Sequence, residues 1–434
     1  MILDSLVPRR VSELLAGLVA VEPVIALHGP RSVGKSTVLR RFAADVGGSV
    51  LDLDDIAVRE AVVGNLASVA GGPAPVCVDE YQRVPDILDA LKARLNREGS
   101  LPGTAVITGS TRQDALPATA QALTGRLHSL TIWPLSQGEI VGIREDLLET
   151  LGADADGVVS QVPSSKTVRR DYVERVCAGG LPLALRRSGA ARARWFDDFV
   201  RASVERDALE LSRIRERQAM TELLGLVAAQ TGQLLNLSAA AEKLGVSRAT
   251  VESHLRLLED LFLVVRLPAW GKTLRSRVSV KPKVHVVDSG LAARLLRLTP
   301  DKLAGLDPAS LADFGHLLET FVVGEIRKQA SWLDEPVTLG HWRTSDGVEV
   351  DLVIEYDDGT VVAVEVKASE RAPGSDFRGL AQLRDALGPR FAGGIILTTG
   401  ARSYTYSDRL HVMPIDRLWT PVTPEPRTAL PHGD

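Results

Sequence analysis

The sequence predicts an α/β protein built from several parts, and three observations carry that prediction. A short apolar run, Val24–Gly29, leads directly into a glycine-rich loop and then into a helical pattern. A second short apolar run, Val76–Val78, ends in two neighbouring carboxylates. Much later in the chain, apolar and polar residues alternate on both sides of a turn at 357–359. That alternation is typical of a β-hairpin.

Composition limits the classes of protein that fit. A length of 434 residues predicts two to four domains. The net charge of −4 means that any nucleic-acid surface has to be local. The two cysteines, Cys77 and Cys177, lack metal-ligand spacing and suit a reducing compartment. The first residues do not resemble a signal peptide, and no run reaches the roughly 18 apolar residues of a membrane span. We therefore expect a cytoplasmic protein without a membrane partner.

The glycine-rich loop matches the pattern G-x-x-x-x-G-K-[ST] in full at 29–36. Glycines allow backbone N–H groups to close around phosphate oxygens, and the following helix adds a favourable dipole. Lys35 would place its charge on the β- and γ-phosphates of ATP, and the Ser36 hydroxyl would bind Mg²⁺. The residues expected to bind the nucleotide are Gly29, Pro30, Arg31, Ser32, Val33, Gly34, Lys35, Ser36 and Thr37.

The carboxylates after the second strand complete the predicted ATP site. Asp79 would hold Mg²⁺, and Glu80 would orient the attacking water. An acidic pair at a strand end can also be a simple helix cap, but the loop upstream favours catalysis. A third strand, Thr104–Ser110, ends where Thr108 or Ser110 could sense the γ-phosphate, or could be turn residues only.

Arg126 follows a turn and precedes a strand-like segment. It is either a surface arginine or an arginine finger that reaches the nucleotide of a neighbouring subunit, where it would stabilise transition-state charge. The second interpretation predicts a homo-oligomer in the presence of ATP.

Several segments together carry a family resemblance. They are GPRSVGKST, VDEYQRVPDIL, ITGST, LTGRLHSLTIWPLS, GGLPLAL, SVERDALELSRIR and KVHVVDSGLAARLL. In this order they resemble the bacterial and archaeal AAA-type ATPases of the AAA_14/DUF4143 family. The resemblance implies an ATPase core with a helical lid. Pro182 also resembles the lid proline in the G-x-P motif of signalling ATPases, which implies that it packs near adenine. Arg206 and Asp207 would contact the nucleotide or a neighbour, or would form local ion pairs on a solvated face.

The middle of the chain has the pattern of a helix-turn-helix. Leu237, Ala240 and Leu244 share one helix face, Gly245 turns the chain, and Ser247 begins a second helix. This arrangement commonly reads DNA, yet the second helix mixes basic and acidic residues. A more basic stretch follows, with Arg266, Lys272, Arg275, Arg277, Lys281 and Lys283. It is a wing that touches phosphates, a solvated hairpin or a protein-docking module.

The hairpin near the C-terminus predicts a nuclease-like core. Residues two apart in a strand share a face, so Glu365 and Lys367 point together, and Asp351 on the preceding strand can meet them. This D…E-x-K arrangement resembles the PD-(D/E)xK nuclease core and suggests a second metal site at Asp351 and Glu365. Glu319 fits the additional acidic position of that core, and Gln382 a supporting polar one. An active nuclease and an inactive scaffold both remain open.

The predicted domains are an ATPase core (1–137), a helical lid (138–217), a winged helix (218–270), a nuclease-like domain (271–425) and a tail (426–434). Residues 151–166 read as a loose surface insert. The predicted function is Mg²⁺-dependent ATP hydrolysis coupled to binding or processing of DNA. The alternative is an ATP-driven protein-interaction switch whose nuclease-like domain is an inactive scaffold.

Overall fold

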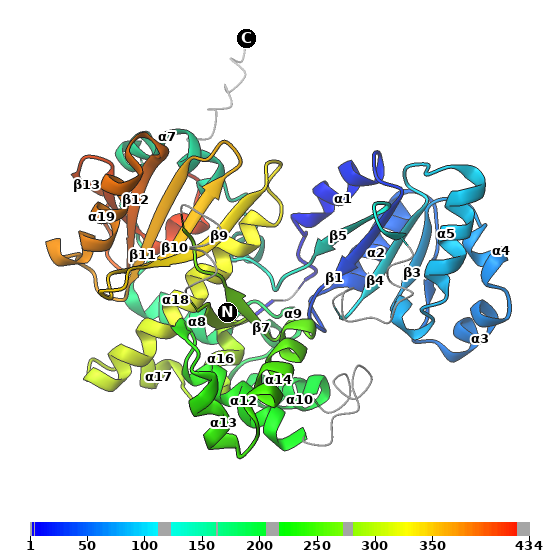
Figure 1. The fold of residues 1–434 in the computed structure, drawn as a ribbon, viewed down its shortest axis with the longest axis horizontal. Helices are drawn as coiled ribbons and strands as arrows, with labels where there is room; N and C mark the ends of the chain where they lie inside the picture. Colours follow the sequence, from blue (N-terminus) through cyan, green and yellow to red (C-terminus); the bar gives the residue numbers. More distant parts are fainter. Residues whose placement is uncertain are drawn as a thin grey trace, which may run out of the picture. The chain divides into compact units, whose positions relative to one another are not determined.

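The computed structural model describes residues 2–3, 5–111, 123–161, 164–204, 217–271 and 281–422. The chain forms two compact units (Figure 1). Unit 1 contains Met1–Leu135, Cys177–Arg266 and Val284–Thr299. Unit 2 contains Ser136–Val176, Leu267–Lys283 and Pro300–Asp434. Arg206, Asp207, Lys272, Arg275, Arg277 and the tail 426–434 lie outside the described residues.

A five-stranded sheet forms the centre of the N-terminal part of unit 1. Its order is β2-β3-β4-β1-β5, and every pair of neighbours is parallel. The strands are β1 (Val24–His28), β2 (Val50–Asp52), β3 (Val76–Asp79), β4 (Ala105–Gly109) and β5 (Leu127–Thr131). The carboxyl ends of β1, β3 and β4 therefore meet at one edge, which is where ligands bind in open parallel sheets.

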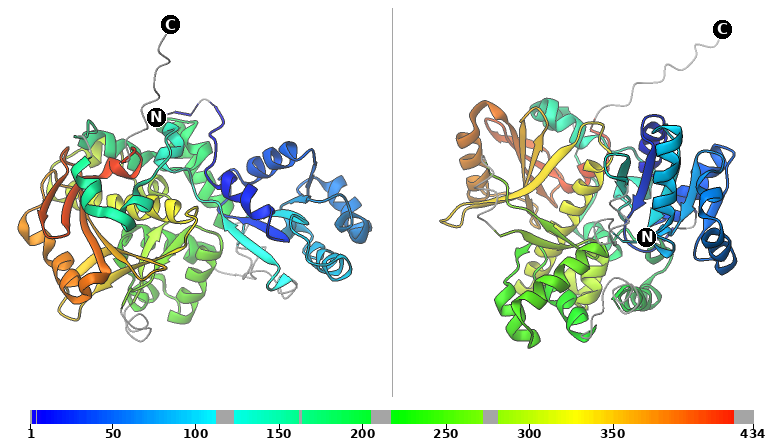
Figure 2. Two further views of the ribbon diagram at one scale, coloured as in Figure 1. Left: turned by 90° about the horizontal axis from the view of Figure 1, so that it is seen from above. Right: turned by 45° about the vertical axis from the view of Figure 1, so that its right-hand side comes forward.

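Helices cover both faces of this sheet (Figure 2). They are α1 (Val11–Val19), α2 (Lys35–Asp45), α3 (Ile56–Gly64), α4 (Leu66–Ala70) and α5 (Ile87–Glu98). An apolar cluster joins alternate residues of β1, β3 and β4 to one face of α5, including Ile87, Leu91 and Leu95. The predicted strand–loop–helix order at 24–45 is confirmed.

The rest of unit 1 is mostly helical. It contains α9 (Pro182–Leu185), α10 (Gly189–Ala202), α12 (Arg217–Ala229), α13 (Leu237–Leu244), α14 (Arg248–Asp260) and α16 (Ser289–Leu295). A small sheet of order β6-β8-β7 is made by β6 (Gln233–Leu234), β7 (Val264–Leu267) and β8 (Lys283–Val286).

The expected pair of helices with a tight turn is present. Gly245 ends α13 with a left-handed φ of 66°, which glycine adopts without steric cost. The Ser247 hydroxyl then accepts a hydrogen bond from the backbone N–H of Thr250 and caps α14. Buried Leu255 and Leu258 give α14 its inner face.

Unit 2 is built on a six-stranded mixed sheet of order β13-β14-β12-β11-β10-β9. Its strands are β9 (Val337–Arg343), β10 (Glu349–Tyr356), β11 (Val361–Lys367), β12 (Phe391–Thr398), β13 (Tyr404–Ser407) and β14 (Leu410–Pro414). Its helices are α6 (Gln137–Val141), α7 (Leu147–Gln161), α8 (Arg169–Ala178), α17 (Pro300–Leu303), α18 (Pro308–Ala330) and α19 (Arg378–Leu387). The predicted hairpin is confirmed as β10 and β11, with Leu352 opposite Val364.

The sheet of unit 2 has a helix layer on each side. Apolar residues of α19, including Leu380 and Leu383, pack against buried apolar residues of β10, β11 and β12. Helices α7 and α18 contact the same sheet, and Figure 1 shows them on the side away from α19. Asp351 and Glu365 lie on two adjacent strands in the middle of this sandwich.

Two expectations need correction or adjustment. Residues 151–166 are not a loose insert, because most of them belong to α7. Leu151, Ala155, Val158 and Val159 recur at helical spacing and are at most 4% exposed. The compact units also divide the segment that we expected to be a single lid, since α7 and the body of α8 belong to unit 2.

Within the described ranges, no helix has both the length and the apolar character needed to cross a membrane.

Candidate functional site: a P-loop nucleotide site and a carboxylate cluster

The phosphate loop is shaped by two glycines in conformations that other residues rarely adopt. Gly29 has a φ of +148°, and a Cβ built on it would lie 2.2 Å from the carbonyl oxygen of Ile132. Gly34, with a φ of +99°, leads into α2, which begins at Lys35. Only glycine allows the backbone to approach this closely and turn this sharply. The loop therefore presents its N–H groups and the N-terminus of α2 to the same space.

Lys35 lies folded against its own loop. Its Nζ donates hydrogen bonds to the carbonyl oxygens of Gly29 (3.0 Å) and Pro30 (2.9 Å), and the residue is 4% exposed. These carbonyls hold the ammonium group within the loop. The charge that a triphosphate requires is therefore already in place.

Asp79 and Glu80 lie at the end of β3, as predicted. The Thr108 hydroxyl donates a short hydrogen bond to Asp79 Oδ1 and accepts one from the backbone N–H of Glu80 at 3.1 Å. Thr108 can do both because β4 lies between β1 and β3 in the sheet. It therefore contacts the Asp79 carboxylate and the Glu80 backbone, and it is not among the residues that line the cavity over the loop.

Glu80 is held by a contact that sequence reasoning missed. Its backbone has φ 56° and ψ 48°, a left-handed conformation that is strained for a residue other than glycine. Gln82 Nε2 donates to Glu80 Oε2 and also to Ser110 Oγ, the latter at 3.1 Å. Ser110 thus joins the site through Gln82. The only sequence signal for Gln82 is its position two residues after the carboxylate.

Burial raises the pKa of Glu80, and the positive charge of Lys35 partly opposes that shift. A carboxylate with a raised pKa beside a phosphate site is typical of a group that orients water.

A cavity of about 340 Å³ lies over the loop. The loop side contributes Arg31 to Thr37 and the carboxylate side contributes Glu80, while Pro182, Leu183 and Arg186 line it from α9 and the residue after it. Pro182 therefore lies in the wall of this cavity.

Arg9 is a second residue that sequence reasoning missed. Its guanidinium donates to the carbonyl oxygens of Val33 (2.6 Å) and Trp133 (2.7 Å), and it lines the same cavity. It therefore ties the loop to the segment that follows β5. No sequence motif marks Arg9, because its two contacts reach residues that lie 24 and 124 positions further along the chain.

Arg126 does not line this cavity. Its guanidinium donates to Asn96 Oδ1 of α5 at 2.6 Å. Within its own chain it has a structural partner, so a role at a nucleotide needs a neighbouring subunit.

Ion pairs neutralise much of the charge on α14, the helix that we expected to contact DNA bases. Arg266 on β7 pairs with Glu252 at 2.8 Å and with Glu259 at 2.5 Å. Arg256 lies 3.7 Å from Glu252. Arg248 and Arg256 remain exposed on α14. The face is one of mixed charge, without a strongly basic strip.

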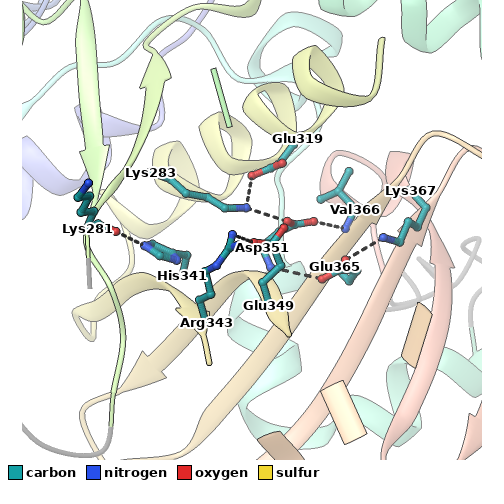
Figure 3. Close-up of polar contacts among 10 residues, drawn as sticks. All are labelled: Lys281, Lys283, Glu319, His341, Arg343, Glu349, Asp351, Glu365, Val366 and Lys367. Atoms are coloured by element: carbon teal, nitrogen blue, oxygen red, sulfur yellow. Dashed lines mark hydrogen bonds and ion pairs between the residues drawn. The ribbon is translucent and has the colours of Figure 1, made fainter. Parts of the chain in front are cut away.

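The carboxylates of the expected nuclease-like core lie close together, and two of them converge on a lysine (Figure 3). Lys283 Nζ lies 2.9 Å from Glu319 Oε1 on α18 and 2.9 Å from Asp351 Oδ1 on β10. Lys367 Nζ lies 2.8 Å from Glu365 Oε1. Asp351 Oδ2 accepts the backbone N–H of Val366 at 3.0 Å. The oxygens of Glu319 and Asp351 thus converge on an ammonium group.

The pKa values reflect this enclosure. Burial and the neighbouring Asp351 raise the pKa of Glu319, whereas Lys283 opposes the shift. Burial lowers the pKa of Lys283, but the carboxylates of Asp351 and Glu319 outweigh it and raise the pKa overall. Lys283 is therefore charged at any physiological pH.

These residues do not fit a divalent metal as they stand. In the part of the chain that the structure describes, no group of three or more His, Cys, Asp or Glu side chains is placed to share a metal ion. Lys283 occupies the point at which the carboxylates of Glu319 and Asp351 converge. The expected second metal site at Asp351 and Glu365 is thus not formed in this structure.

Two further expectations about this region are wrong. Lys283 belongs to the basic stretch for which phosphate contacts are one expectation, but it is 3% exposed and paired with carboxylates. Gln382 does not support the cluster, because α19 turns Leu380 and Leu383 towards the sheet and leaves Gln382 exposed.

The phosphate loop, the buried Lys35 and the Asp79–Glu80 pair at the sheet edge define a P-loop nucleoside triphosphatase. Comparison with protein families agrees with that class. The chain matches an AAA domain over residues 21–141, a domain of unknown function (DUF8612) over 169–302 and a second one (DUF4143) over 314–418. The chain belongs to the AAA-type ATPases that join an AAA domain to a C-terminal DUF4143 domain, and it is an ATP-hydrolysing enzyme.

Two mycobacterial proteins resemble nearly the whole chain. They are the uncharacterized proteins Rv2008c of Mycobacterium tuberculosis and Mb2031c of Mycobacterium bovis. Each is 25% identical over 399 residues, which cover 92% of this chain and 81% of the relative.

Solved structures give weaker likenesses. The Walker-type ATPase PABY2304 of Pyrococcus abyssi aligns with a TM-score of 0.41 and 16% identity, over 66% of this chain and 94% of that one. The RuvB Holliday junction branch migration motor of Thermotoga maritima aligns with a TM-score of 0.31 and 14% identity, over 69% of this chain and 97% of that one. The assignment therefore depends on the family models and on the site itself.

Proposed function

We propose that this chain is a Mg²⁺-dependent ATP hydrolase in which Glu80 orients the attacking water, and that hydrolysis controls how the protein engages a macromolecular partner. The observation that carries the first part is the edge of the parallel sheet. There the loop cavity, Lys35 and the paired carboxylates come together within one unit.

The donors for Mg²⁺ suit that ion. The hydroxyl of Ser36 and the carboxylate of Asp79 are hard oxygen ligands, which Mg²⁺ prefers. Asp79 is 2% exposed, and the guanidinium of Arg40 lies 3.8 Å from its Oδ2. When bound, Mg²⁺ would neutralise charge on the β- and γ-phosphates.

The remaining roles belong to side chains and backbone of this chain. The N–H groups of the loop would bind phosphate oxygens, and Lys35 would exchange its two carbonyl partners for the β- and γ-phosphates. Glu80, fixed by Thr108 and Gln82, would accept a hydrogen bond from water and aim it at the γ-phosphorus. Pro182 and Leu183 would offer an apolar wall to the base.

Two variants test this assignment. Lys35→Ala should weaken nucleotide binding, because the charge on the phosphates is lost. Glu80→Gln should bind ATP with near wild-type affinity but hydrolyse it at least a hundredfold more slowly. Binding is measured with a fluorescent ATP analogue and hydrolysis by phosphate release. Wild-type hydrolysis by Glu80→Gln would refute the role of Glu80.

For the partner, we favour DNA bound through phosphate contacts. The support is the paired helices α13 and α14, with Lys243, Arg248 and Arg256 exposed. With the small β6-β8-β7 sheet, we interpret this part as a winged helix. Since phosphate contacts release counterions, binding of a labelled duplex should weaken steeply between 50 and 200 mM salt. Arg248→Ala should reduce the affinity, whereas Glu242→Ala on the same pair of helices should not.

The second candidate is a protein-interaction switch. It is favoured by the pairing of Arg266 with Glu252 and Glu259, which leaves α14 with a face of mixed charge. Such a face suits a protein partner better than a phosphate backbone. Absence of duplex binding at 50 mM salt, with and without ATP, would select this candidate.

A further inference from the structure

Lys283 occupies the place where a nuclease-like core would hold a metal ion. It is the first residue of β8, and its side chain reaches between α18 and β10 (Figure 3). Only 4% of the Lys283 side chain is exposed. The side chains of its two partners, Asp351 and Glu319, are 9% and 11% exposed. An ammonium group this deeply buried is stable only when it is paired. Both pairing distances are 2.9 Å.

The neighbouring contacts give Asp351 and Glu365 further hydrogen-bond partners. Asp351 uses its second oxygen on the backbone N–H of Val366, and its own N–H donates to Glu365 Oε2 at 3.4 Å. Glu365 in turn pairs with Lys367. Each of the three carboxylates is thus bound by a lysine or by the backbone. Nothing in this arrangement requires an added cation.

The other charged groups near the cluster are directed elsewhere. Arg343 pairs with Glu349 at 2.7 Å on the adjacent strands. The ring of His341 is hydrogen-bonded to the carbonyl oxygen of Lys281 at 3.0 Å, and burial lowers its pKa to about 4, so it is neutral. Lys283 is therefore the cation that Glu319 and Asp351 share.

We propose that Lys283 is a built-in cation that replaces a divalent metal in the carboxylate cluster, so that the DUF4143 domain of this chain folds and works without a metal. The cluster gains an affinity for divalent metal only when the ammonium group is removed. The domain is accordingly not a metal-dependent nuclease in the state that the structure describes.

The test measures binding of Mn²⁺ to the full, nucleotide-free chain by electron paramagnetic resonance of the free ion. Wild type and Asp351→Asn should bind equal amounts, because the cluster contributes no site. Any Mn²⁺ at Ser36 and Asp79 is common to both proteins and cancels. One additional Mn²⁺ per wild-type chain, lost in Asp351→Asn, would overturn the proposal.

The gain-of-site variant is Lys283→Met, which keeps the length and apolar stem of the side chain. It should bind one more Mn²⁺ per chain than wild type, because removing the ammonium group frees the carboxylates of Glu319 and Asp351. Adding Asp351→Asn should abolish the gain. The matched control is Lys281→Met, two residues away and exposed, which should behave as wild type. A folded Lys283→Met that binds no additional Mn²⁺ would overturn the proposal.

Loss of folding in Lys283→Met is also decisive. The proposal then predicts either that Mn²⁺ restores the fold, or that removing all three charges in Lys283→Met/Glu319→Gln/Asp351→Asn does so. Circular dichroism melting curves measure both, and ATP hydrolysis reports on unit 1. If neither treatment restores the fold, Lys283 is needed for packing and not as a counter-ion, and the proposal fails.

Discussion

At the scale of single residues, Glu80 shows how local strain is stabilised by a neighbour. Its left-handed backbone aims the carboxylate towards the phosphate cavity, and strain of this kind concentrates at functional sites. Thr108 fixes the backbone N–H and Gln82 fixes the carboxylate. The catalytic geometry therefore depends on residues that would not touch ATP.

Gln82 provides the first test of that dependence. Gln82→Ala should lower kcat for ATP hydrolysis about tenfold and leave KM unchanged, because Glu80 loses its orientation but the nucleotide contacts remain. Arg83→Gln on the same turn is the control, since Arg83 pairs with Asp54 (3.0 Å) and should change neither constant by more than twofold. A rise in kcat would instead mean that Gln82 restrains Glu80.

Glu145 predicts a pH-dependent stability. Burial raises its pKa to about 7, although the Ser136 hydroxyl donates to it. Since the folded pKa lies above the unfolded value, the native state binds the extra proton. The associated stability is complete below about pH 4.5 and is lost as the pH rises through 7.

Glu145→Gln should remove most of this dependence. Urea denaturation measures the free energy of unfolding at pH 5 and at pH 8. Between these pH values, the free energy of unfolding should fall by roughly 3 kcal/mol more in the wild type than in the variant. Glu149→Gln, on the exposed side of α7, should lose as much as the wild type. Equal losses for Glu145→Gln and wild type would contradict the assignment.

At the scale of elements, helix α19 packs on the sheet of unit 2 with its backbone close to the backbone of β10. A Cβ built on Gly379 of α19 would lie 2.3 Å from the carbonyl oxygen of Glu349 on β10. A Cβ built on Gly324 of α18 would meet no atom of the described residues within 4 Å. The same substitution should therefore have opposite effects in the two helices.

Gly379→Ala should destabilise the protein by about 1–3 kcal/mol, because backbone atoms have to move apart. Gly324→Ala should stabilise it by roughly 0.5–1 kcal/mol, because alanine restricts the unfolded chain and favours helix. Chemical denaturation of unit 2, followed by tryptophan fluorescence, measures both. A neutral Gly379→Ala would show that α19 does not need this contact.

At the scale of the whole molecule, the position of Arg126 raises the question of whether a second copy completes the ATP site. Arg126 is bound to Asn96 in its own chain and does not line the cavity. An arginine finger would therefore have to come from a neighbouring subunit. ATP should then promote oligomers, and specific activity should rise with protein concentration.

Mixing two inactive variants tests this directly. Arg126→Ala lacks the finger and Lys35→Ala lacks the phosphate contact, so mixed oligomers contain some interfaces with both groups intact. Activity should recover partly on mixing, by up to about a quarter of wild type for random pairing at interfaces, since each variant supplies the missing half. Asn96→Ala serves as the control for the intrachain contact. Full activity of a strictly monomeric protein in light scattering would exclude the idea.

The elements whose chemistry is local could be predicted from the sequence. The phosphate loop, the strand that ends in Asp79 and Glu80, the paired helices α13 and α14, and the β10–β11 hairpin each depend on residues close together in the chain. Short-range patterns of glycines and apolar residues specify such elements directly. The meeting of Asp351 and Glu365 followed from the hairpin in the same way.

The surroundings of these residues come from contacts between distant parts of the chain, which no local pattern predicts. Lys283 meets Glu319 and Asp351 across 36 and 68 positions, and Arg9 reaches Trp133 across 124. Ser110 joins Glu80 through Gln82 because β4 lies beside β3. In sequence, Lys283 belongs to a basic stretch that suggests phosphate contacts. Folding buries it between two carboxylates, and because a buried charge needs a partner of opposite sign, that burial makes it a counter-ion.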